Sequence, residues 1–108
     1  MAIDWSSVGG SVEQAVASVL GSDWGIVGPA ARAQISALVQ TAQAIEADKD
    51  NMSGDEYDVL RLTQQRALEG VLSAYAAISI VAAEQAAAAA WNVVAQALKT
   101  AYPALSFL

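Results

Sequence analysis

The sequence contains no cysteine and no histidine. Without cysteine the chain has no disulfide bonds and no thiolate nucleophile, and without either residue type it has no Cys/His zinc site. The lack of histidine also excludes every catalytic device that depends on an imidazole, including the serine–histidine–aspartate triad. We therefore predict that the protein is not an enzyme and that it carries no cofactor or metal ion.

Charge is also scarce. Charged residues make up 15% of the 108 residues and hydrophobic residues 56%, against about 25% and 45–50% in an ordinary soluble domain. The net charge is −6, and the five basic residues are scattered, whereas a nucleic-acid surface needs clustered Lys and Arg. We expect a single domain that binds no nucleic acid directly and that is covered in part by other protein chains.

Residues 1–27 predict a short helix followed by a connector. Gly9 and Gly10 favour an irregular start, and Ser11 with Gln14 has the spacing of a capping box. Gly21 is expected to end this helix. The N-terminal segment has no positive charge ahead of an apolar run, so we expect no secretory signal peptide.

Residues 28–47 form the clearest amphipathic helix of the sequence. Pro29 is suited to its first position, because the missing N–H has no partner there in any helix. The apolar positions recur at helical spacing: Ala31, Ile35, Leu38, Val39, Ala42 and Ile45.

Residues 48–54 are strongly polar and predict a turn. Ser53 and Glu56 form a second capping box at its end. The spacing of Asp48, Asp50 and Gly54 is partly that of a calcium-binding loop, but the sequence lacks the required oxygen ligand, glycine and glutamate at three further positions. We therefore expect no calcium binding.

Residues 55–102 predict one long helix, about 70 Å in length at 1.5 Å per residue. It contains no proline, Gly70 is its candidate kink, and Pro103 is expected to end it ahead of an apolar tail, 103–108. The predicted fold is all-α: a short N-terminal helix, then a helical hairpin with a long C-terminal arm.

The long predicted helix is apolar on every face within residues 71–83, which is typical of a buried helix. The two shorter helices are not expected to cover it in a monomer, so we predict contact with neighbouring chains. Glu84 is the one charge between residues 70 and 98, and it must reach water or a donor such as Arg32.

The alanine run 86–90 has two interpretations. Alanine is the best helix former, and its small side chain also allows two helices to approach closely. The tryptophans outside the long helix are either core anchors or docking groups. The predicted assembly interface comprises Ile80, Ala87, Ala88, Trp91, Val94 and Leu98 on the long helix, Leu105 in the tail, and Trp5 and Trp24.

In its alanine-rich, cysteine-free composition the chain resembles small helical proteins of tailed-bacteriophage particles, over residues 28–102. That resemblance implies a non-enzymatic structural protein of the neck, tail or internal head, present in many copies and found in the virion or the host cytoplasm. The small secreted helical hairpins with Trp-x-Gly at their turn do not fit, because Trp24 and Gly25 are adjacent and precede the hairpin.

Two other functions are compatible with the sequence. Residues 70–98 are long enough to span a bilayer, which would make the protein a small pore former, although the central Glu84 opposes insertion. The third alternative is a soluble inhibitor that binds one host protein, which requires a stable monomer.

Overall fold

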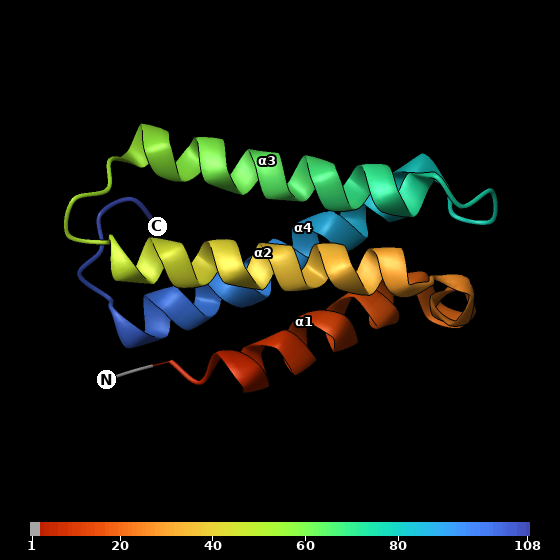
Figure 1. The fold of residues 1–108 in the computed structure, drawn as a ribbon, viewed down its shortest axis with the longest axis horizontal. Coiled ribbons are helices and arrows are strands. Elements are labelled where there is room, and N and C mark those ends of the chain that lie inside the picture. The colour runs from red at the N-terminus through yellow and green to blue at the C-terminus, as the bar shows by residue number, and fades with distance from the viewer. Residues whose placement is uncertain (1–2) are drawn as a thin grey trace.

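Helices that follow one another in the chain run in opposite directions in the computed structural model (Figure 1). The structure describes residues 3–108, which form four α-helices, one 3₁₀ helix and no strand. In chain order these are α1 (Trp5–Leu20), η1 (Gly21–Ile26), α2 (Pro29–Ala47), α3 (Gly54–Ser73) and α4 (Ile80–Ala101). The all-α prediction is confirmed, with an up–down–up–down bundle as the architecture.

The first helix begins earlier than predicted. Asp4 is its N-cap: the backbone N–H of Ser7 donates to Asp4 Oδ1 over 3.3 Å, and the Ser7 hydroxyl donates to Oδ2 over 3.0 Å. The predicted start at Ser11 is therefore wrong. Gly9 and Gly10 lie inside α1, where each costs about 1 kcal/mol relative to alanine, and packing of the half-buried Trp5 and Val8 against the core offsets that cost.

The end of α1 and the whole of α2 agree with the predictions made from the sequence. Gly21 follows α1 with a φ of 59°, a left-handed conformation that glycine adopts readily. α2 begins at Pro29, as predicted. The buried face of α2 consists of the six predicted residues, Ala31, Ile35, Leu38, Val39, Ala42 and Ile45.

The predicted turn and second capping box are also confirmed. Between α2 and α3, Ser53 accepts a hydrogen bond from the backbone N–H of Glu56 over 3.1 Å. The Glu56 side chain in return accepts from the backbone N–H of Ser53 over 3.3 Å. These two bonds fix the first turn of α3.

The prediction of a single long helix over residues 55–102 is wrong, because the chain reverses direction between α3 and α4. Gly70 lies within α3, which continues past it to Ser73. Ser79 caps α4 by accepting a hydrogen bond from the backbone N–H of Ala82 over 3.0 Å. Ile78 is buried in the turn, and the Tyr75 hydroxyl accepts from the backbone N–H of Gly28 over 3.0 Å. These contacts hold the reversal at residues 74–79.

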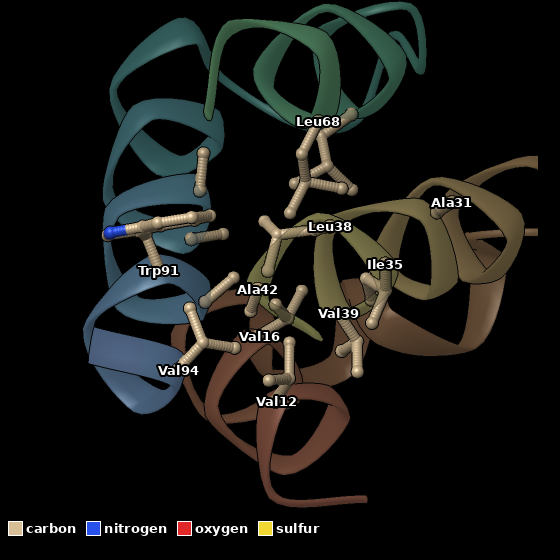
Figure 2. Packing of buried hydrophobic residues seen from close by; sticks show 14 of the residues in the cluster. Val12, Val16, Ala31, Ile35, Leu38, Val39, Ala42, Leu68, Trp91 and Val94 are labelled. Carbon is tan, nitrogen blue, oxygen red and sulfur yellow. The ribbon is translucent and has the colours of Figure 1, made fainter. Parts of the chain in front are cut away.

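The reversal lets the chain cover most of its own apolar surface. α4 packs most extensively against α1 and also contacts α2 and α3. Its buried face is Ala83, Ala86, Ala87, Ala90, Trp91, Val94 and Leu98. In Figure 2, Val16 of α1, Leu38 of α2, Leu68 of α3 and Val94 of α4 lie around one common interior. The alanine-rich face of α4 therefore contacts helices of the same chain.

Candidate interaction surface

The predicted assembly interface divides into three groups in the structure: one buried, one half-buried, and Ile80, which is exposed. Ala87, Trp91, Val94 and Leu98 are at most 2% exposed and belong to the core of the chain itself. In this fold they cannot face another subunit. For these four residues the predicted assembly interface is therefore wrong, because they pack against other helices of the same chain. Periodicity identified a buried face correctly but did not identify the helices that bury it.

The second group is half-buried: Trp5, Trp24, Ala88 and Leu105. Trp24 lies in η1, where the Arg32 guanidinium carbon is 5.4 Å from the centre of its ring. Arg32 Nε is also 3.4 Å from Glu13 Oε1, so this arginine links α2 to η1 and α1. Glu84 does not require Arg32, because its side chain is exposed and reaches water.

Trp91 makes a buried polar contact as well as packing in the core. Its Nε1–H donates to the Tyr57 hydroxyl over 2.9 Å, and the two rings meet edge to face with centroids 6.0 Å apart. Tyr57 is in turn 5.0 Å from the ring of Phe107 in the C-terminal tail. The tail thus packs back onto α3. The polar atoms of Trp91 and Tyr57 are hydrogen-bonded to each other within this cluster.

Glu46 connects three helical segments near the end of the bundle where α2 stops. Trp5 Nε1 donates to Glu46 Oε1 over 2.8 Å, and the Tyr102 hydroxyl donates to Oε2 over 2.6 Å. Burial alone would raise the pKa of the Glu46 carboxyl, but these two bonds stabilise the carboxylate and hold its pKa below the ordinary value. The same contact raises the pKa of Tyr102.

Sequence reasoning missed this cluster entirely. Trp5 and Tyr102 are 41 and 56 residues from Glu46 in the chain. No local spacing relates residues that far apart, and only the packing of α1, α2 and α4 brings them together. Lys49 adds to the cluster, with its Nζ 4.7 Å from the centre of the Tyr102 ring.

The surface also carries an open groove along α4. Ile3, Val93, Ala97 and Ala101 supply its apolar wall, and Asn92, Gln96 and Thr100 its polar groups. No titratable side chain lines this groove, so it offers no general acid or base. Within residues 3–108, no cluster of three or more acidic side chains is placed to hold a metal ion.

The predicted bilayer-spanning segment, 70–98, is divided between α3 and α4 by the turn at 74–79. Of the helices in the described part of the chain, none combines the length and hydropathy needed to cross a membrane.

Large apolar side chains remain exposed chiefly at one end of the bundle. Ile80 and Val81, in the first turn of α4, are 67% and 60% exposed, and Ile26 at the end of η1 is 49% exposed. Figure 1 places η1 and the α3–α4 turn at this same end. We call it the apolar end; its members are Ile26, Ala30, Val71, Ala74, Ala76, Ala77, Ile80 and Val81.

The opposite end of the bundle is acidic. The α2–α3 turn lies there (Figure 1). Residues 48–58, which we call the acidic end, contain five of the eleven acidic residues and one lysine. By contrast, residues 70–83 contain no charged residue. Acidic residues are therefore more concentrated at the acidic end than in residues 70–83, and the acids nearest to the apolar end are Asp23 in η1 and the exposed Glu84 in α4.

Comparison with known protein families, with characterised proteins and with solved structures finds no match to this chain in sequence or in fold.

Proposed function

We propose that the protein is a non-enzymatic structural protein that works in multiple copies within an assembly. The observation that carries this proposal is the exposure of Ile80, Val81 and Ile26 at one end of the bundle; with Val59 on α3, they are the large apolar side chains that stay exposed within residues 3–108. Apolar side chains grouped on a surface mark sites of protein contact more often than isolated ones do.

The setting that we propose is a phage or phage-like particle, as a neck, tail or internal head component. The support for it is the alanine-rich, cysteine-free composition of the chain, with alanine at 25 of 108 positions. A small bundle with a satisfied core and exposed apolar side chains at one end fits a building block that contacts its neighbours through surface residues.

Native mass spectrometry and sedimentation velocity of the purified protein test the proposal. We expect oligomers whose population rises with concentration between about 10 μM and about 1 mM, a range that covers weak protein interfaces. A single monomer mass across that range would contradict self-assembly and would favour the alternative of an inhibitor that binds one host protein.

A further inference from the structure

The C-terminal tail, residues 103–108, packs against α3 and the second half of α4. In Figure 1 it turns back from the end of α4 across the end of the bundle. The ring of Phe107 lies 5.0 Å from the ring of Tyr57 of α3, at an interplanar angle of 37°. The end of the tail also shares a hollow with the two helices, which is lined by Tyr57, Asn92, Ala95, Gln96, Lys99 and Leu108. The tail therefore occupies the surface between α3 and α4.

Beneath the tail lies a pair of aromatic residues at the edge of the core. Tyr57 is 5% exposed, although Asp58 and Val59 beside it on α3 are exposed. Its hydroxyl accepts the hydrogen bond from Trp91 Nε1–H, and Figure 2 shows the Trp91 ring nitrogen pointing away from the interior that the four helices share. Because Phe107 packs on the Tyr57 ring, release of the tail exposes Tyr57 and opens a path to the Trp91 indole.

Side-chain packing, rather than hydrogen bonding, holds the tail in place. In the described part of the chain, its hydrogen bond is a local one, from the Leu105 backbone N–H to the Tyr102 carbonyl over 3.1 Å. Phe107 and Leu108 are half-buried and pack against the core. Segments with few buried contacts and few hydrogen bonds open locally at a low cost in free energy. The tail can therefore detach without breaking the hydrogen bonds of the helices.

Tyr102 fixes the point at which such an opening stops. Its backbone N–H donates to the Leu98 carbonyl over 2.8 Å, and its hydroxyl donates to Glu46 over 2.6 Å. Pro103 follows, and proline has no N–H with which to extend α4. The tail and the end of α4 are thus held by separate interactions, so loss of the tail contacts leaves the helix in place.

We infer that the tail is a strap that opens while the four α-helices stay folded, and that the surface beneath it binds an uncharged apolar peptide segment with an aromatic side chain. The tail itself defines this ligand, because residues 103–108 contain no charged side chain and place Phe107 on the Tyr57 ring. The side-chain amides of Asn92 and Gln96 line the same hollow and can hydrogen-bond to a peptide backbone. The tail competes with any such segment for the site. The inference concerns the single chain and does not require the proposed self-assembly.

Hydrogen exchange of the wild-type protein, followed by NMR, tests whether the strap opens on its own. Trp91 Nε1–H reports on the covered site, and the backbone N–H of Val16, a fully buried residue of α1, reports on global unfolding. From zero to about 1 M urea we expect Val16 exchange to accelerate about tenfold, because global unfolding exposes a large surface. Trp91 exchange should change by less than about twofold, since opening of the strap exposes little surface. Equal acceleration at both positions would show that the site opens only when the helices unfold, and would overturn the strap.

Titration with a synthetic peptide that has the sequence of residues 103–108 tests the binding site. Phe107→Ala in the full-length chain weakens the strap, so a larger fraction of the molecules has a free site. Apparent affinity scales with that fraction, and we expect the peptide to bind this variant at least about fivefold more tightly than the wild type. Leu105→Ala, which truncates a half-buried tail residue outside the ring contact, should stay within about twofold of the wild type. The Trp91 Nε1–H signal measures binding, and circular dichroism confirms that both variants keep their helix content.

The aromatic side chain of the ligand supplies the specificity of the proposed site. The same peptide with alanine in place of its phenylalanine should bind Phe107→Ala at least about tenfold more weakly. A tail joined to its site by a few residues has an effective concentration in the millimolar range, so the free peptide should bind at or below about 5 mM. Equal binding of the two peptides, or no shift of the Trp91 signal at that concentration, would overturn the peptide site.

Discussion

The hydroxyl of Tyr102 donates a 2.6 Å hydrogen bond to Glu46, across 56 residues of sequence. The same carboxylate accepts from Trp5, so a single side chain of α2 holds the beginning of α1 and the end of α4. The contact makes stability depend on pH, because it favours the charged carboxylate of Glu46 and the neutral hydroxyl of Tyr102.

Acidification should weaken the bundle through Glu46. Its pKa is lower in the folded state than its ordinary value of 4.5, so its stabilising effect is complete above that value and is lost as the pH falls through the lower, folded-state pKa. Glu46→Gln should reduce the free energy of unfolding at pH 7 by about 1 kcal/mol, allowing for partial exposure. It should also flatten the decline below pH 4.5. Urea unfolding at a series of pH values measures both effects, with the exposed Glu84→Gln as the control. Equal losses in the two variants would contradict a specific role for Glu46.

Removal of the Trp91–Tyr57 hydrogen bond should destabilise the core. Trp91→Phe leaves the Tyr57 hydroxyl without its buried partner, so we expect a loss of about 1–3 kcal/mol, including the smaller ring. Tyr57→Phe strands the indole N–H in the same way. The double variant should lose less unfolding free energy than the sum of the losses in the two single variants, because it leaves no buried polar atom without a partner. Thermal or urea unfolding of all four proteins completes the cycle, and strictly additive losses would show that the bond contributes nothing.

Enlarging the alanine face of α4 should act on the single chain. Ala87 is 1% exposed, so Ala87→Leu overpacks the core and should cost about 1–3 kcal/mol of unfolding free energy. Ala88 is half-buried, and Ala88→Leu should cost less. Unfolding is best followed at low protein concentration, where association does not contribute. If Ala87→Leu lowers the free energy of unfolding only at high protein concentration, this face of α4 contacts another chain, as predicted from the sequence.

Two glycines should respond in opposite directions to alanine. Gly70 lies inside α3 with open space where a Cβ would stand, so Gly70→Ala should stabilise the protein by about 0.5–1 kcal/mol. Gly21 has open space too, but its φ is 59°, and Gly21→Ala should cost about 1–2 kcal/mol. Differential scanning calorimetry of the two variants provides the comparison. Destabilisation by Gly70→Ala would indicate that the helix is bent there after all.

Local signals in the sequence were sufficient for the middle of the fold. The six buried positions of α2, its start at Pro29 and the Ser53–Glu56 capping box depend on residues within a few turns of one another. The same kind of reasoning failed at residues 74–79, where good helix formers predict continuation. There the outcome depends on the hydrogen bond between Gly28 and Tyr75, 47 residues apart, and on burial of Ile78.

The candidate surface was predictable only in part. Ile80 was predicted at the interface and is exposed, but Ala87, Trp91, Val94 and Leu98 are in the core of the chain. Helical periodicity indicates that a face is buried, and it carries no information on whether the same chain or another one buries it. Val81 and Ile26 become conspicuous only after the reversal at 74–79 places them at a common end.

The extensive packing of α1 against α4 has a consequence for synthesis of the protein. α1 is translated before any residue of α4, so its buried valines, Val12 and Val16, leave the ribosome without their main partner. α2 and α3 can pair as soon as both have emerged, because they are joined by a short turn. We therefore expect the nascent chain to stay incompletely folded, and open to chaperones, until its last helix is released.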